Sequence, residues 1–210
     1  MPKLKPEELE ARRTEIVEAA RTCFLRSGFH QTTTDEICRE ANITPGGLYH
    51  YFTSKDELIG VVIEYSAKMA MERMRKVVEA ADNTETAFRQ AVGFLQATLT
   101  DPDIENIARL DVEIWAESFK NEKLADRNRG IWMLRLRWLE AMIESGMRDG
   151  LIAGDANKHA MASLMLAMLI GLRTGNLLLG EEFDTVGALD ELLKMQAARS
   201  SFPLVSLKAS

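Results

Sequence analysis

Four residues in the first sixty positions of the chain have side chains that suit contact with an anion. Thr33 and Lys55 each stand at the N-terminus of a predicted helix, where unpaired backbone N–H groups and the helix dipole favour a phosphate. Tyr49 and His50 lie between them on the outward side of a short predicted helix, from which they can reach phosphates or base edges. These residues predict a surface that recognises a phosphate-bearing partner.

The start of that short helix suits a close approach by a partner. Thr44 is placed to cap the helix, and Pro45 occupies its first position, where the missing N–H costs nothing. Gly46 and Gly47 follow, and because glycine has no Cβ, the backbone there can come close to another molecule. The whole segment 42–54 contains no acidic residue, so no carboxylate on it repels a phosphate.

Helical periodicity runs along the chain and predicts an all-α fold. Proline is rare, with 5 residues, and alternating Val- and Thr-rich runs are absent. Caps and breaks predict helices over about 6–27, 33–41, 44–52, 54–81, 84–99, 101–119, 122–148, 155–179 and 184–199. The first is expected to stop at Gly28. The helix over 122–148 carries two apolar stripes, which predict burial on both of its sides.

Two short helices joined by a tight turn, packed under a longer first helix, have the geometry of a helix-turn-helix, whose second short helix enters the major groove of DNA. The segment 33–58, TTDEICREANITPGGLYHYFTSKDEL, together with Ser27-Gly28-Phe29, closely resembles the DNA-binding signature of the TetR family of regulators. The resemblance implies a DNA-contacting set made of Thr33, Thr34, Thr44, Pro45, Gly46, Gly47, Tyr49, His50 and Lys55, with Arg13 and Arg39 as further phosphate candidates.

In that family the remaining helices sense a ligand and form the dimer, and the resemblance implies the same here. We therefore expect an N-terminal three-helix helix-turn-helix domain over 1–55, a larger helical ligand-binding and dimerisation domain over 56–200, and a flexible tail over 201–210. The runs 114–117 and 171–173 are similar to regulators of the choline-responsive type, but the ligand is not carried over.

Apolar stripes on the last two long helices predict a homodimer through a two-fold four-helix interface. The first stripe includes Met161, Leu164, Met165, Met168, Leu169 and Leu172, and the second includes Val186, Leu189, Leu192, Leu193 and Met195. Gly171, Gly175 and Gly180 would let the helices approach closely.

Two charged residues interrupt apolar stripes and mark a candidate effector site. A charged group at Asp111 or at Arg173 is costly unless it has a partner. The two residues are therefore a structural pair, a salt bridge between subunits or part of a ligand site. Trp115 and Trp132, with Trp138, could wall such a site or simply fill the core. The candidate effector-binding set is Asp111, Trp115, Trp132 and Arg173.

Composition restricts the remaining possibilities. Cys23 and Cys38 form no metal-binding or disulfide pattern, which favours small core residues in a cytoplasmic protein. The N-terminus is too charged for a signal peptide, and the longest apolar run, about 13 residues, is too short to cross a membrane. No nucleophile elbow, phosphate loop or metal-spaced ligand set is present, so neither an enzyme nor a cofactor or metal is predicted.

The sequence thus predicts a repressor that binds near-palindromic operator DNA as a homodimer and is released by a small-molecule effector. The net charge of -6 is the observation against this prediction, because bulk electrostatics do not favour DNA binding by an acidic chain. A helical protein-interaction module and a co-effector-dependent activator remain as alternatives.

Overall fold

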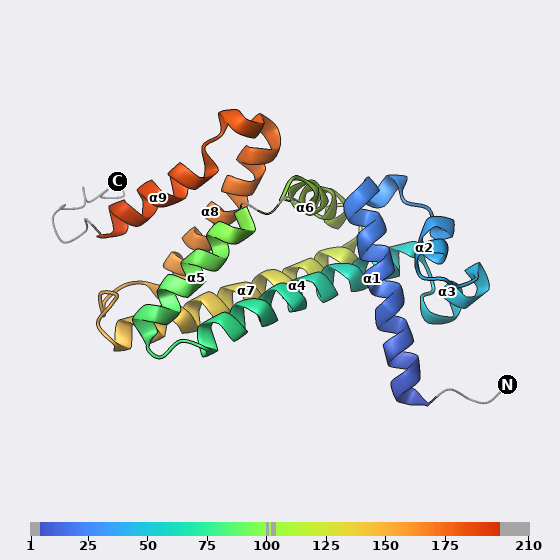
Figure 1. Cartoon of the computed structure of the whole chain (residues 1–210), viewed down its shortest axis with the longest axis horizontal. Helices are drawn as coiled ribbons and strands as arrows, with labels where there is room; N and C mark the ends of the chain where they lie inside the picture. Colours follow the sequence, from blue (N-terminus) through green and yellow to red (C-terminus); the bar gives the residue numbers. More distant parts are fainter. Residues whose placement is uncertain (1–4, 100, 102–103, 198–210) are drawn as a thin grey trace.

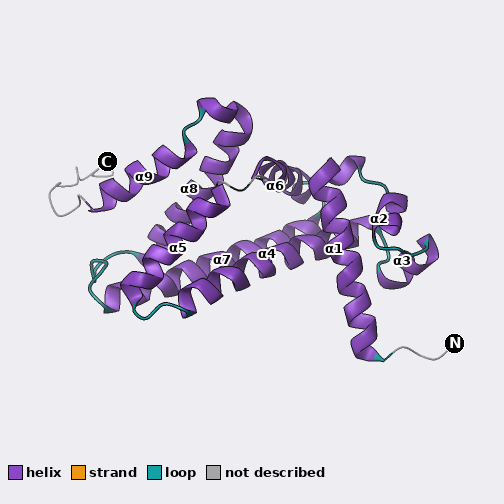
Figure 2. Cartoon of the chain, viewed as in Figure 1, coloured by secondary structure: helices purple, strands orange, loops and turns teal. Residues whose placement is uncertain are grey.

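The structure, a computed structural model, describes residues 5–99, 101 and 104–197, and every regular element within these ranges is helical (Figure 2). The predicted all-α class is confirmed. Three helices, α1 (Pro6–Gln31), α2 (Thr34–Glu40) and α3 (Pro45–Tyr51), gather at one end of the molecule, which we call the head (Figure 1). The predicted tail over 201–210 lies outside the described residues.

The other helices extend away from the head. In chain order they are α4 (Lys55–Glu79), α5 (Thr84–Leu99), α6 (Ile104–Ser118), α7 (Glu122–Arg148), α8 (Lys158–Leu179), a 3₁₀ turn η1 (Gly180–Glu182) and α9 (Thr185–Ala197). The long helices α4 and α7 run alongside each other, and α8 packs on α7 (Figure 1). α6 packs on α1, α7 and α8, so it joins the head to the larger part of the molecule.

The short helices of the head begin where their caps predict. The hydroxyl of Thr33 accepts a hydrogen bond from the N–H of Glu36, and the Glu36 carboxylate accepts one from the N–H of Thr33, so both halves of a capping box form. Thr44 caps α3 by accepting from the N–H of Gly47, with Pro45 at the first helical position. Ser54 caps α4 in the same way.

The end of the first helix differs in part from the prediction. Gly28 breaks the helix as expected, with a φ of 78° that favours glycine. The chain then turns helically once more and the element ends at Gln31 rather than Ser27. Thr32 closes this extra turn, because its hydroxyl donates to the carbonyl oxygens of Gly28 at 2.7 Å and Cys23 at 3.2 Å.

Large aromatic and branched side chains fill the centre of the head. Phe24 and Phe29 pack edge to face with ring centroids 5.0 Å apart, and Phe52, Ile37 and Ile16 are fully buried with them. Each such side chain contributes about 1.5–3 kcal/mol relative to an exposed one, which fixes the short helices on α1 without help from a disulfide.

The two cysteines are small core residues, as predicted. Cys23 and Cys38 are buried and carry free thiols. Burial raises the pKa of both thiols, which disfavours the reactive thiolate.

The core of the head continues into the larger part of the chain. Leu110 and Ile114 of α6, with Leu124 and Ile131 of α7, belong to the same buried cluster as the head residues. Buried residues of α4, from Leu58 to Ala67, belong to this cluster as well. The predicted boundary between residues 55 and 56 therefore falls at the first turn of a helix that both parts share.

The first residues described for α8 and α6 differ from the predicted ones. α8 begins at Lys158 rather than near Asp155, because Asn157 is the cap and accepts from the N–H of Ala160 at 3.0 Å. An asparagine carboxamide caps as well as a carboxylate. α6 is described from Ile104, and the predicted proline start at residue 102 lies outside the described residues.

α7 is not buried on both sides within one chain. Ile131 and Ile143 are buried, but Leu134 and Met133 are exposed and Trp138 is only half-buried. The prediction of two-sided burial is therefore wrong for the single chain, because none of the helices that the structure describes covers the Leu134 side.

Within the described residues, the segment Lys158–Glu182 is long and apolar enough to cross a membrane by length and composition, and 17% of its most apolar window is buried in the chain. That segment contains Arg173, which is buried and paired with Asp111 of α6. A guanidinium in such a pair favours a helix that packs on protein over one that faces lipid.

Candidate nucleic-acid interface and ligand cavity

The exposed surface of α2, α3 and the turn between them carries most of the residues predicted to touch DNA. Thr33, Thr44, Pro45, Gly46, Tyr49 and His50 are exposed, and Thr34, Gly47 and Lys55 are half-buried. Tyr49 leaves 53% of its surface open to solvent, so its side chain is free to contact a partner. The structure therefore brings the nine predicted residues to one end of the molecule with their polar atoms accessible.

α3 is held from beneath by the side chains that the helical period assigned to its inner face. Leu48 and Phe52 are buried, and Tyr51 packs partly on the same core. On the outer side, a Cβ added at Gly46 would meet no atom within 4 Å, while one at Gly47 would press on the Thr44 hydroxyl at 3.3 Å. Gly46 thus presents bare backbone to whatever approaches α3, and Gly47 makes room for the cap.

Carboxylates already occupy two of the predicted anion sites. The Glu36 carboxylate accepts from the N–H of Thr33 at 2.7 Å and from its hydroxyl at 3.1 Å. Glu57 accepts from the N–H and hydroxyl of Thr53 at 2.7 and 2.6 Å, beside Lys55. These hydrogen bonds hold the pKa of Glu36 and of Glu57 below the ordinary value. A phosphate at Thr33 would therefore have to displace the Glu36 carboxylate from the hydroxyl or the backbone N–H of Thr33.

The two additional arginine candidates, Arg39 and Arg13, differ in the contacts that their guanidinium groups make. Arg39 is exposed, and its Nε donates to the Asp35 carbonyl oxygen at 3.4 Å. The Arg13 guanidinium lies 5.0 Å above the ring of Phe52, a cation–π contact that positions it at the edge of α3.

Arg12 positions the turn between α2 and α3, a role that was not predicted from the sequence. Arg12 of α1 donates to the carbonyl oxygens of Ala41 at 3.3 Å and Asn42 at 3.0 Å. Asn42 has a φ of 51°, the left-handed conformation that lets the chain turn from α2 to α3. Because the partners are 30 residues apart, no local pattern could reveal that Arg12 fixes this turn.

α6 grips the head at the break in α1. The Glu113 carboxylate accepts from the N–H of Phe29 at 2.6 Å, just after Gly28. The Arg109 guanidinium donates to the Leu25 carbonyl oxygen at 3.0 Å, and His30 lies 3.2 Å from the Glu117 carboxylate. Glu113 and Arg109 thus satisfy backbone groups that the break in α1 leaves open, and Glu117 adds a side-chain contact one turn further along α6.

A cavity of about 500 Å³ lies beside this contact, between α1, α4, α5, α6, α7 and α8. All four residues predicted for the effector site line it, namely Asp111, Trp115, Trp132 and Arg173. Trp138 does not. The volume lies within the range of small-molecule sites.

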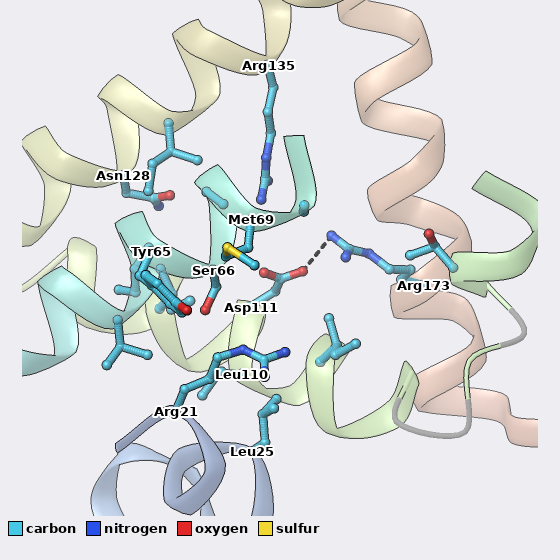
Figure 3. A pocket seen from close by; sticks show the side chains of 18 of the residues that line it. Arg21, Leu25, Tyr65, Ser66, Met69, Leu110, Asp111, Asn128, Arg135 and Arg173 are labelled. Atoms are coloured by element: carbon cyan, nitrogen blue, oxygen red, sulfur yellow. Dashed lines mark ion pairs between the residues drawn. The ribbon is translucent and has the colours of Figure 1, made fainter. Parts of the chain in front are cut away.

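The predicted charges meet inside the cavity as a pair. Arg173 of α8 and Asp111 of α6 are 2.5 Å apart, with side chains 10% and 19% exposed (Figure 3). Of the alternatives that the sequence left open, a salt bridge between subunits is therefore wrong, since both partners belong to one chain.

Several polar residues that line the cavity were not predicted from the sequence, and Arg135 and Ser66 are two of them. Arg135 of α7 extends toward the same space as Asp111 and Ser66 of α4 (Figure 3). Burial lowers the pKa of the Arg135 guanidinium, Asp111 opposes that effect and Arg173 adds to it. The spacing of three between Trp132 and Arg135 places both on one helix face, and this signal could have identified Arg135. Among the described residues, no group of three His, Cys, Asp or Glu could hold a metal ion.

Comparison with known proteins adds independent information. The family profile described as "Bacterial regulatory proteins, tetR family" matches residues 16–62, and that of the "BetI-type transcriptional repressor, C-terminal" matches residues 89–198. The transcriptional regulator UidR of Escherichia coli is 30% identical over 165 residues, covering 79% of this chain and 81% of the relative.

Two solved structures share the fold. A regulator from Saccharomonospora viridis in complex with choline is 19% identical, with a TM-score of 0.75, covering 89% of this chain and 95% of the other. FadR from Bacillus subtilis in complex with stearoyl-CoA is 17% identical, with a TM-score of 0.70, covering 87% and 96%. One of these neighbours holds a cationic molecule and the other an acyl thioester, so the fold alone does not fix the ligand.

Proposed function

The chain belongs to the TetR family of bacterial regulatory proteins, and on that premise we propose a repressor that binds near-palindromic operator DNA as a homodimer and leaves it when a small molecule fills the cavity. Such a protein acts in the cytoplasm, on the chromosome. One observation carries the proposal: the exposed, acid-free surface of α3 belongs to a head whose helix α1 is hydrogen-bonded to α6, the same helix that supplies Asp111 to the cavity.

For DNA contact we propose the nine residues identified from the sequence. α3 lies in the major groove with Thr44, Pro45, Gly46 and Gly47 nearest the base edges. Tyr49, His50 and Lys55 contact phosphates, joined by the hydroxyls of Thr33 and Thr34. Most of these contacts come from neutral groups, so we expect the operator affinity to fall with salt less steeply than for a strongly basic protein.

For the dimer we propose the outer faces of α8 and α9. Ala160, Leu164, Ala167, Gly171 and Leu178 follow each other at helical spacing along α8, and all are exposed. Leu164 and Leu178 leave 58% and 74% of their surfaces uncovered, a cost that a second subunit would remove. Val186 of α9 is exposed too, while Leu189 is buried and the side chains of Leu192, Leu193 and Met195 lie outside the described residues.

Of the three glycines assigned to close helix contact, only Gly171 keeps that role in the proposal. A Cβ at Gly175 would collide with the ring of Phe183 in the same chain. Gly180 ends α8 with a φ of 56°.

For signalling we propose that α6 transmits occupancy of the cavity to the head. Asp111 faces the cavity and Glu113, two residues on, holds Phe29. A ligand that disturbs the Asp111–Arg173 pair shifts α6, and the head moves with it. Release requires only that the ligand bind the shifted form more tightly than the DNA-bound form. We propose that residues 1–55 contact DNA and that residues 56–200 bind the ligand and form the dimer. Helix α4 connects the two parts.

Selection of genomic fragments by the purified protein tests the proposal, followed by affinity measurements on the recovered site across a salt series. We expect a near-palindrome bound by one dimer or more, with preference over random DNA persisting as salt rises. A folded protein that enriches no site would contradict the proposal and favour a protein-interaction module.

A further inference from the structure

The charges deep in the cavity do not balance. The interior holds two guanidinium groups, Arg135 and Arg173, against one carboxylate, Asp111, and the carboxylate is already paired with Arg173. No hydrogen bond or ion pair joins Arg135 to any residue that the structure describes. A cationic side chain in this setting lacks the partner that buried charges require.

The polar atoms around this charge are also incomplete. Nε of Arg173 and Oγ of Ser66 are both shielded from solvent and have no hydrogen-bond partner within the described residues. Nε of Arg173 and the Arg135 guanidinium can only donate, while the Ser66 hydroxyl can donate as well. Three unsatisfied donor groups that line one cavity need an acceptor with several lone pairs, which a carboxylate provides.

The other ionisable groups of the cavity lie where water reaches them. Glu18, Arg73 and Asp101 are exposed at its rim, and Arg21 is half-buried on α1. Glu18 and Asp101 both have partners, so neither is available to neutralise Arg135. Arg21 adds positive charge on the side of the cavity that faces the head (Figure 3).

The rest of the wall is apolar. Branched and aromatic side chains surround the charged centre, and they include Val62, Ile107, Leu110, Ile131, Trp115 and Trp132. Such a wall favours a ligand whose body is hydrophobic.

We infer that the effector is an organic acid with an apolar body, whose carboxylate binds Arg135 and accepts from Ser66 and Arg173. This inference rests on the proposed function, since it names the ligand class of the same cavity. A quaternary ammonium such as choline, which the Saccharomonospora viridis regulator binds, is disfavoured here, because it would add a third positive charge beside Arg135 and Arg173.

Two sets of compounds with matched skeletons test the ligand class on the full-length protein: octanoate, octanamide and octylamine, and 3-phenylpropanoate with its amide and amine. Thermal melts and titration calorimetry at pH 7.5 should give tighter binding for the carboxylate than for its amide in at least one set, by tenfold or more. An amide or amine that binds as tightly as the acid in both sets overturns the inference, and so does the absence of carboxylate binding.

Arg135→Met gives a second readout that needs no ligand. Because the substitution removes a half-buried charge that has no ion-pair partner among the described residues, we expect the ligand-free melting temperature to rise by roughly 2–4 °C and the preference for carboxylates to disappear. Arg129→Met is the matched control, since Arg129 lies on the same helix with its side chain 70% exposed, and it should change neither property. A fall in the melting temperature of Arg135→Met would show that Arg135 is structural and overturn the inference.

Operator binding of the same samples separates the two proposals. Wild type and the Arg129→Met control should bind the selected operator fragment equally well without ligand. If neither binds any fragment, the proposed function fails; if both bind but no carboxylate is preferred, only the ligand class fails.

Discussion

The carboxylate of Glu113 accepts a hydrogen bond from the backbone N–H of Phe29 at 2.6 Å, across 84 residues of sequence. This contact fills the gap that Gly28 opens in α1, and it leaves so little room that a Cβ at Gly28 would collide with the Glu113 carboxylate. The break in α1 and the acid on α6 are therefore parts of one joint between the head and the cavity.

Removing this acid should weaken the joint. Glu113→Ala leaves the Phe29 N–H without its partner, so we expect the free energy of unfolding to fall by about 1–3 kcal/mol, measured by urea denaturation. The variant should also respond less to an effector, because α6 no longer holds the head. Glu105→Ala, at an exposed position in the first turn of α6, is the control. Equal stability of the two variants would contradict the assigned role.

Tyr49 and Tyr51 are adjacent but should behave oppositely. Tyr49→Ala removes an exposed side chain, so we expect operator affinity to fall at least about tenfold while the melting temperature and dimer stay unchanged. Tyr51→Ala removes a side chain packed on the core and should lower stability instead. Gel-shift titration and thermal melts check both, and unchanged operator affinity in Tyr49→Ala would refute its place at the DNA.

The exposed face of α8 can be tested by charge. Leu164→Arg places a guanidinium where 58% of a leucine surface is now open, so the fold should be retained while a like charge from each subunit opposes the other across the interface. Sedimentation should show dimers for wild type and monomers for the variant. Lys158→Ala, at the exposed start of the same helix, should remain dimeric. A dimeric Leu164→Arg protein would place the interface elsewhere.

The caps of α2 and α4 should make the head sensitive to acid. The pKa of Glu36 and of Glu57 is lowered in the folded protein by hydrogen bonds from Thr33 and Thr53. A carboxyl group with a lowered folded pKa stabilises the fold above its unfolded pKa, and this stability is lost as pH falls through the folded value.

We therefore expect the melting temperature of the wild type to fall below about pH 4.5, the ordinary value of these groups. The double variant Glu36→Gln, Glu57→Gln should be less stable at neutral pH and should lose less on acidification. Parallel profiles for the two proteins would show that other carboxyl groups cause the acid loss.

The Asp111 carboxylate lies near two guanidinium groups, so its removal should lower the free energy of unfolding of the ligand-free protein. Asp111→Asn leaves Arg135 and Arg173 facing each other without a carboxylate, so we expect a loss of up to about 3–5 kcal/mol, reduced by the 19% exposure of the Asp111 side chain. Octanoate should restore more stability to this variant than to wild type. Equal rescue by octanamide would show that the effect is not one of charge.

Much of this molecule could be predicted because its signals are local. The caps at Thr33, Thr44 and Ser54 and the break at Gly28 act through residues three or four positions away, and hydrogen bonds of that range are visible in the sequence. The inward position of Leu48 and the outward position of Tyr49 follow from the helical period alone. Local sequence signals alone therefore predict the helix-turn-helix and its exposed face.

The tertiary structure decided everything that depends on residues far apart in the chain. The clamp of Arg12 on the Asn42 carbonyl, the pairing of Asp111 with Arg173 and the lack of a partner for Arg135 come from the packing of separate helices. Periodicity shows that a charged residue lies on an apolar face, but it cannot show which other helix meets that face. The charge of the cavity interior is a sum over α6, α7 and α8, and it exists only once these helices are packed together.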